Sequence, residues 1–265
     1  MTYKLIALVG VVLLVGGCTA PESERIEEQP DFAPHFEAAG VSGTFVLYDP
    51  VAGRTLVHNP ERAAEPFLPA STFKILNALI ALETGAAADT ATVVPWDGVE
   101  RSIAAWNRDH TLASGFRNST VWYYQEMARR IGAERMQDYV QRTDYGNGDI
   151  GGGLDVFWLM GDLRITALEQ VAFLERLHRR ELPFSPATMD AVSGIMIEDQ
   201  GPDYVLRAKT GWGVAPDPDV GWYVGSVVRG ERPYFFALNL EVHGPDDVAA
   251  RREVAHAILR SLDLL

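Results

Sequence analysis

Basic residues are scarce in this sequence. Its 265 residues include 23 lysines and arginines against 36 aspartates and glutamates, so the formal net charge is -13. A protein that binds nucleic acid needs a surface that neutralises phosphate groups, and this charge balance opposes such a surface. We therefore expect no nucleic-acid partner.

Histidine and cysteine are also sparse, and their spacing does not suggest a metal site. The six histidines are scattered along the chain, without an HExxH motif or any paired spacing: His35, His58, His110, His178, His243 and His256. Metal centres in proteins are built from such residues at short, regular spacings. The sequence predicts no metal.

Long hydrophobic runs are missing apart from one at the N-terminus. Residues 1–17 carry one lysine and then an apolar run from Leu5 to Val15, which is short for a membrane span and typical of a signal peptide. The chain's single cysteine, Cys18, stands where a bacterial lipoprotein signal places the residue that is lipidated after cleavage. A plain secretory signal with an incidental cysteine is the alternative. We expect a secreted protein of the bacterial periplasm or cell envelope, attached to a membrane only through a lipid on Cys18.

The rest of the chain is predicted to form a short tether and one folded domain. Residues 18–31 are polar, acidic and bracketed by prolines, a composition typical of a flexible segment. Residues 32–265 show no repeats and no low-complexity tract, and they are long enough for one large core or for two lobes that share a cleft.

Strand patterns lie towards both ends of this domain and helix patterns lie between them. The predicted strands are residues 41–49, 55–59, 203–211, 220–230 and 232–242. The predicted helices are residues 71–85, 119–132, 166–182, 185–196 and 245–262. We expect an α/β (α+β) fold: a five-stranded antiparallel sheet flanked by helices, built from about 32–65 and 183–265, with an all-helical lobe inserted at about 66–182. The active site is expected at the interface of the two lobes.

The stretch PASTFK at 69–74 places Ser71 three residues before Lys74 at the start of a predicted helix. A serine there is usually a helix cap, but residues three apart share a helix face, so the hydroxyl and the amine can meet. The following apolar side chains disfavour a charged lysine, and burial lowers the pKa of a lysine. A neutral lysine can act as a base, or can combine with carbon dioxide as a carbamate.

Two further fragments have the same chemical character. Lys209, Thr210 and Gly211 end a predicted strand, where an amine and a hydroxyl could hold a substrate carboxylate. Ser119 stands at the start of another predicted helix, where capping is the ordinary role. Each fragment alone is a weak signal, but the order SxxK, serine, KTG is typical of active-site serine enzymes that recognise penicillin.

From about residue 32 to its end, the chain resembles a class D β-lactamase of the oxacillinase type. The motifs that carry the resemblance are STFK at 71–74, STV at 119–121, YGN at 145–147, GGGLDVFWLMGDLRIT at 151–166 and KTGWG at 209–213. A class A enzyme would carry an SDN-type triplet and a separate glutamate motif, and class C chains lack the FWL element. The resemblance implies hydrolysis of the β-lactam amide through a serine acyl-enzyme, and hence β-lactam resistance.

The resemblance also assigns catalytic roles to individual residues. Ser71 would be the acylated nucleophile, and Lys74, as an N-carboxylated lysine, the general base, with no other cofactor. Trp158 would donate its indole N–H to the carbamate, with the apolar Val121 beside it. Ser119 and Lys209 would pass a proton to the leaving nitrogen.

The remaining implied roles concern substrate binding. The backbone amides of Ser71 and Trp212 would form the oxyanion hole. Thr210, Gly211 and Arg251 would bind the substrate carboxylate, although Arg252 is adjacent to Arg251 and either arginine could instead serve the helix face. Tyr145 of the YGN element belongs to the implied substrate-binding set.

Two alternatives share the acylation step. One is a β-lactam receptor that is acylated once and signals without turnover. Such domains also resemble class D enzymes, but they are joined to transmembrane helices and carry a polar residue where this chain has Val121. The other is a D,D-peptidase that acts on cell-wall peptides.

Overall fold

The computed structural model describes residues 25–214, 218–244 and 247–265. The expected signal peptide at 1–17 and the expected lipidation site at Cys18 lie outside the described residues. No helix in the described ranges combines the length and hydrophobicity that crossing a bilayer requires.

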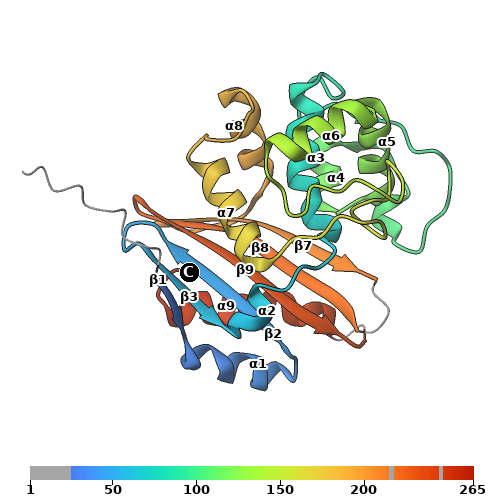
Figure 1. The fold of residues 1–265 in the computed structure, drawn as a ribbon. Helices are drawn as coiled ribbons and strands as arrows, with labels where there is room; N and C mark the ends of the chain where they lie inside the picture. The colour runs from blue at the N-terminus through green and yellow to red at the C-terminus, as the bar shows by residue number, and fades with distance from the viewer. Residues whose placement is uncertain (1–24, 215–217, 245–246) are drawn as a thin grey trace, which may run out of the picture.

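A seven-stranded sheet forms the centre of the described structure, with the strand order β1-β3-β2-β9-β8-β7-β6 (Figure 1). Its strands are β1 (Arg25–Glu28), β2 (Gly43–Asp49), β3 (Arg54–His58), β6 (Ile197–Gln200), β7 (Tyr204–Gly213), β8 (Asp219–Arg229) and β9 (Arg232–Val242). All neighbours are antiparallel except β1 and β3, which run parallel. Strands β4 (Val93–Val94) and β5 (His110–Thr111) form a separate pair.

The mixed α/β fold and the five predicted strands are confirmed, but the strand count is not. The sequence analysis missed the short pair β4 and β5 and two strands of the large sheet. Those two are both at edges of the sheet: β1 has the sequence RIEE and β6 has the sequence IEDQ. All four residues of β6 are exposed. Edge strands of this kind are held by backbone pairing and not by an apolar face, so their sequences carry no strand pattern.

Strand β1 also differs from the flexible tether expected at 18–31. Residues 25–28 pair in parallel register with Arg54 to Val57 of β3, and the Gln29 N–H donates to the Val57 carbonyl oxygen at 2.7 Å. Backbone hydrogen bonds to an existing sheet edge therefore order a segment whose composition suggested a linker. The domain boundaries in 32–265 stay a prediction.

Helices cover both faces of the sheet. They are α1 (Ala33–Ala39), α2 (Pro60–Ala63), α3 (Lys74–Glu83), α4 (Leu112–Arg117), α5 (Val121–Ile131), α6 (Ala133–Arg142), α7 (Ala167–His178), α8 (Pro186–Ile195) and α9 (Asp247–Ser261), with 3-10 turns η1 (Pro30–Phe32), η2 (Ala70–Phe73) and η3 (Ala104–Trp106). Figure 1 shows α1 and α9 on one face, and α7 with the cluster α3 to α6 and α8 on the other. All five predicted helices are present, and α7 begins with a capping box formed by Thr166 and Glu169.

The alternation of β8 separates two hydrophobic cores. Val220, Trp222 and Val224 point into the core shared with the helical cluster, whereas Tyr223 and Val227 point into the core under α9. Helix α3 has buried residues on all its sides, from Lys74 to Ala81. A helix buried all round is held by packing in a fixed position, so its first residue, Lys74, is fixed as well.

Candidate active site

Ser71 and Lys74 meet where η2 runs into α3. The Lys74 Nζ atom lies 2.6 Å from the Ser71 Oγ atom, within hydrogen-bond distance. The N-cap residue of η2 is Pro69, which forms no side-chain cap hydrogen bond. The Ser71 hydroxyl and the Lys74 amine therefore do not cap this turn. The main chain before the serine is strained: Ala70 has a φ of 49° and donates its N–H to the Trp158 carbonyl oxygen at 2.9 Å.

Burial changes the acid–base chemistry of Lys74. The side chain is fully buried, and this desolvation lowers the pKa of Lys74 to about 7. The ring of Tyr124, whose centroid lies 5.7 Å from Nζ, is one of its neighbours. At neutral pH a large fraction of this amine is therefore uncharged, and an uncharged amine in contact with a hydroxyl can accept its proton.

Trp158 is fully buried next to this pair. Its ring stacks on Phe73, the residue before Lys74, with ring centroids 5.2 Å apart. Its indole Nε1–H group has no hydrogen-bond partner among the described residues. A buried donor without a partner is costly in a folded protein and usually marks a group that acts on something else.

Ser119 and Lys209 form a second serine–lysine pair, contributed by opposite sides of the site. The Lys209 Nζ atom on β7 lies 3.0 Å from the Ser119 Oγ atom and 3.0 Å from the Thr210 carbonyl oxygen. Ser119 does not cap α5, whose N-cap is Thr120; it adopts a left-handed φ of 54° instead. The strained backbone is what turns this hydroxyl towards the sheet and away from the helix end.

The two lysines are electrostatically linked. Desolvation lowers the pKa of Lys209 well below its ordinary value, and the nearby Lys74, Arg252 and Arg251 lower it further. Two ammonium groups in one buried site repel each other, so protonation of one lysine disfavours protonation of the other. The protonation states of Lys74 and Lys209 are therefore coupled.

A cavity of about 240 Å³ opens over these groups between β7, η2 and the helical cluster. Its lining residues are Ser71, Ile103, Trp106, Asn118, Ser119, Val121, Leu159, Thr210, Gly211, Trp212 and Arg251. Seven of the residues predicted from sequence are in this lining. Lys74 and Lys209 are each hydrogen-bonded to a lining serine, Ser71 and Ser119.

The cavity wall also includes residues that the sequence analysis did not single out. Leu159 belongs to the FWL element, and Asn118 precedes Ser119, so both were within reach of a motif argument. Ile103 and Trp106 come from η3 and the residue before it. No motif marks them, because a side chain that reaches the site from a distant loop is placed by the tertiary fold alone.

Gly211 brings β7 against the turn that carries Ser71. A Cβ atom at position 211 would lie 3.1 Å from the Pro69 carbonyl oxygen and 3.2 Å from the Thr72 Cγ2 atom. Glycine is therefore the residue that fits this close approach. Trp212, the next residue, is 47% exposed, and its Nε1–H donates to Asp219 Oδ2 at 2.8 Å. The oxyanion hole expected from the amides of Ser71 and Trp212 stays a prediction.

The structure distinguishes between the two adjacent arginines. Arg251 is buried, lines the cavity and donates its Nη1–H to the Gly211 carbonyl oxygen. Burial is the main reason why the pKa of Arg251 falls to about 10, so it stays charged at neutral pH. Arg252 turns to the side and pairs with Glu198 at 2.9 Å. Arg251 is thus the arginine that faces the cavity.

Tyr145 differs from its predicted place in the substrate-binding set. It is 1% exposed and is absent from the cavity lining. Its ring packs edge-on against Phe73, with centroids 5.7 Å apart, and against Phe173 at 5.0 Å. Since Phe73 directly precedes Lys74, Tyr145 contributes to the site by packing against Phe73 and not by lining the cavity.

No group of three or more histidine, cysteine, aspartate or glutamate side chains that could hold a metal ion occurs within the described ranges. The polar side chains at the cavity include hydroxyls, the Asn118 amide, the Arg251 guanidinium and the two lysine amines bonded to Ser71 and Ser119. They can supply a nucleophile, a base and hydrogen bonds to an anionic ligand.

Comparisons with known proteins agree with this geometry. The model of the penicillin binding protein transpeptidase domain matches residues 43–260. Among curated proteins, β-lactamase OXA-48 of Klebsiella pneumoniae is 38% identical and covers 97% of both chains. The probable β-lactamase YbxI of Bacillus subtilis is 45% identical and covers 78% of both chains.

Solved structures give the same assignment. The class D β-lactamase YbXI from Nostoc superposes with a TM-score of 0.87 at 46% identity, covering 88% of this chain and 99% of that chain. The class D β-lactamase FUS-1 (OXA-85) from Fusobacterium nucleatum subsp. polymorphum gives a TM-score of 0.87 at 34% identity, covering 90% of this chain and 100% of that chain. With Ser71 and Lys74 in contact beneath a cavity, and with relatives of this similarity, the chain belongs to the class D family of serine β-lactamases.

Proposed function

We propose that this protein hydrolyses the amide bond of β-lactam antibiotics through a serine acyl-enzyme and thereby confers resistance to them. The observation that carries the proposal is the 2.6 Å contact between the buried Lys74 amine and the Ser71 hydroxyl at the wall of a cavity. A neutral base next to an alcohol is the arrangement that nucleophilic catalysis requires. The β-lactamases among the relatives support the substrate class.

In the proposed acylation step, the Ser71 oxygen attacks the lactam carbonyl carbon while its proton leaves towards the Lys74 side. The carbon–nitrogen bond of the ring then breaks, and the ring nitrogen takes up a proton. The Ser119 hydroxyl, hydrogen-bonded to Lys209 at 3.0 Å, is placed to deliver that proton. Water then attacks the ester and releases the product, which restores the Ser71 hydroxyl.

Two residues fit a carbamate on Lys74. Carbon dioxide combines only with an uncharged amine, and burial lowers the pKa of Lys74 to about 7. The carboxylate of a carbamate accepts hydrogen bonds, and the buried Trp158 Nε1–H is a donor that has no partner among the described residues. When present, a carbamate supplies a general base for both steps. Val121, which lines the cavity, is apolar and brings no side-chain polar group to this part of the site.

The N-terminal segment completes the proposal. We propose that residues 1–17 act as a signal peptide and that Cys18 carries a lipid anchor, which would place the enzyme in the bacterial periplasm or cell envelope. Mass spectrometry of the mature protein is expected to find a lipidated Cys18 as the first residue. A mature N-terminus elsewhere would contradict the anchor.

The function is tested by turnover. The purified protein is expected to open a chromogenic cephalosporin through many cycles, whereas Ser71→Ala, the control, should show no turnover above background. A single stoichiometric burst without further product would support the receptor alternative. Release of D-alanine from a D-alanyl-D-alanine peptide faster than cephalosporin opening would support the peptidase alternative.

Arg251 and Arg252 offer a matched pair of variants for substrate binding. Arg251→Gln is expected to raise the KM for a penicillin by about 10–100-fold with a smaller change in kcat, because a charge-assisted hydrogen bond to the substrate carboxylate is lost. Arg252→Gln removes the same charge from the same helix, but this arginine faces Glu198. The KM of the Arg252→Gln variant for the penicillin should stay within about two-fold of the wild-type value. Equal effects of the two changes would assign the role to general charge and not to Arg251.

A further inference from the structure

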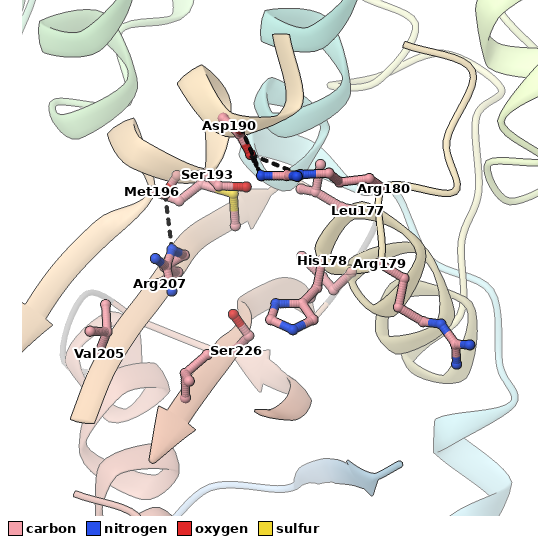
Figure 2. Close-up of a pocket in the computed structure, with 12 residues that line it drawn as sticks. Leu177, His178, Arg179, Arg180, Asp190, Ser193, Met196, Val205, Arg207 and Ser226 are labelled. Carbon is pink, nitrogen blue, oxygen red and sulfur yellow. Dashed lines mark hydrogen bonds and ion pairs between the residues drawn. The ribbon is translucent and has the colours of Figure 1, made fainter. Parts of the chain in front are cut away.

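A second cavity, of about 480 Å³, lies on the same face of the sheet as Lys209 but away from Ser71. The end of α7, helix α8 and strands β7 and β8 enclose it (Figure 2). Its lining residues are Leu174, Leu177, His178, Arg179, Arg180, Asp190, Ser193, Met196, Val205, Arg207, Ser226 and Val228. None of them lines the active-site cavity, so this is a separate site.

Arg207 on β7 supplies an unneutralised positive charge to this cavity. Its guanidinium is partly buried and donates one hydrogen bond, from Nε to the Ser193 carbonyl oxygen at 3.2 Å. Within the part of the chain that the structure describes, Arg207 forms no ion pair with a carboxylate; desolvation lowers its pKa, but an arginine stays charged at neutral pH. A partly buried guanidinium with free N–H groups is an incomplete anion site.

The other charged groups of the lining are already neutralised. The Arg180 Nη2 group donates to both carboxylate oxygens of Asp190, at 2.7 and 2.9 Å. Figure 2 shows this ion pair. Arg179 pairs with Glu175 and Glu181. Among the described residues, Arg207 is thus the charged side chain of the lining that has no oppositely charged partner.

Ser226 and His178 add two neutral donors beside this charge. Ser226 is the cross-strand partner of Arg207, is 6% exposed, and has no side-chain hydrogen bond within the described ranges. Figure 2 shows its hydroxyl directed into the cavity, between Arg207 and the His178 ring. Burial and the charge of Arg207 both lower the pKa of His178, which leaves a neutral imidazole with one N–H to donate. A guanidinium, a hydroxyl and an imidazole thus line the same cavity.

The remaining lining is apolar and large enough for an organic molecule. It consists of Leu174, Leu177, Met196, Val205 and Val228. Small-molecule sites are typically cavities of about 300–1,000 Å³ with apolar walls and a few convergent polar groups. A bare inorganic anion would leave most of these walls uncovered.

We propose that this cavity binds an organic monocarboxylate with an apolar body. The carboxylate accepts hydrogen bonds from the free N–H groups of Arg207, from the Ser226 hydroxyl and from the His178 ring. The apolar body lies along Leu174, Leu177 and Val228. The planar fork of a guanidinium matches a carboxylate, so Arg207 fixes the position of the ligand.

The test is a titration of the purified protein with sodium hexanoate, followed by the backbone and arginine side-chain N–H signals in nitrogen-15 NMR spectra. Saturable one-to-one shifts at Arg207, Ser226 and His178 are expected, and Ser71→Ala should bind hexanoate as the wild type does. Hexan-1-ol, which has the apolar body without the charge, should bind at least about ten-fold more weakly. Inorganic phosphate should also bind more weakly than hexanoate, because it lacks the apolar body.

Variants identify the residue that carries the binding. Arg207→Gln is expected to weaken hexanoate binding by about 10–100-fold and Ser226→Ala by about 3–10-fold. Arg229→Gln is the matched control: it removes a positive charge from neighbouring β8, where Arg229 pairs with Asp203 outside the cavity, and should change binding by less than about two-fold. Circular dichroism confirms that each variant is folded; should Arg207→Gln not fold, Ser226→Ala and Arg207→Lys carry the test.

Three outcomes would overturn the proposal. The first is the absence of saturable hexanoate shifts at these residues. The second is equal binding by wild type, Arg207→Gln and Ser226→Ala, which would place the ligand elsewhere. The third is tighter binding of phosphate or hexan-1-ol than of hexanoate, which would contradict the chemical class of the ligand.

Discussion

Replacement of Lys74 by methionine is expected to lower β-lactam turnover by at least about 10³-fold. Methionine keeps most of the side-chain volume, so the packing of α3 is retained while the amine that lies within hydrogen-bond distance of the Ser71 hydroxyl is removed. Without a base, the nucleophile keeps its proton and acylation slows by the factor that general base catalysis supplies. Steady-state hydrolysis of a penicillin and the rate of acyl-enzyme formation, followed by mass spectrometry, measure the loss.

Trp158→Phe serves as the companion variant, because it retains Lys74 and the stack on Phe73 but removes the unpartnered indole N–H. If that donor holds a carbamate, this variant should lose about ten-fold or more in activity, and added bicarbonate should restore part of it. Near-normal turnover by Lys74→Met would refute the role of the lysine. Wild-type activity and bicarbonate response in Trp158→Phe would refute the role of the indole.

The same Lys74→Met protein is expected to be more stable than wild type at pH 7, by roughly 2–4 kcal/mol in buffer depleted of carbon dioxide. The folded-state pKa of Lys74 is about 7, whereas an unfolded lysine has its ordinary value of 10.5. Between these two values the unfolded chain binds more protons than the folded one, so the free energy of unfolding rises with pH. Replacing the amine removes the cost of burying Lys74 in the neutral form. The free energy of unfolding of the variant should therefore rise less between pH 7 and 10 than that of wild type. Urea unfolding at both pH values measures it.

Leu79→Met is the control for this measurement, since Leu79 is fully buried on the same helix and carries no charge. It should cost less than about 1.5 kcal/mol and leave the pH dependence of wild type unchanged. A Lys74→Met protein that is less stable than wild type at pH 7, or that keeps the full pH dependence, would show that burial does not depress the pKa of this lysine.

The backbone around the active site is strained, which is consistent with a site that lowers the stability of the protein. Ala70 and Ser119 both hold a left-handed φ, near 49° and 54°, although neither is glycine. Each lies at or next to a serine whose hydroxyl faces a lysine amine. Strain of this kind persists only where the surrounding structure enforces it. Here the enforcing elements are the fully buried helix α3 and the close contact of η2 with Gly211.

Local sequence patterns determined five strands of the sheet, five of the helices and the chemical pairings. The serine and lysine at 71 and 74 are three positions apart, and the helical turn alone brings such residues together. The helices predicted at 166–182 and 185–196 and the strands predicted at 220–230 and 232–242 were likewise readable, because each pattern depends on neighbours in the chain.

Tertiary structure alone decided what depends on distant contacts. Strands β1 and β6 exist because a sheet edge accepts their backbones, whatever their side chains. The same holds for the orientation of Arg251 towards the cavity and Arg252 towards Glu198, for the burial of Tyr145, and for Ile103 and Trp106 in the cavity wall. The cavity around Arg207 belongs here too, since Ser226 and His178 reach it from a neighbouring strand and from α7. The burial of a side chain and the register between distant segments are set only when the whole chain packs. No local sequence pattern could therefore predict them.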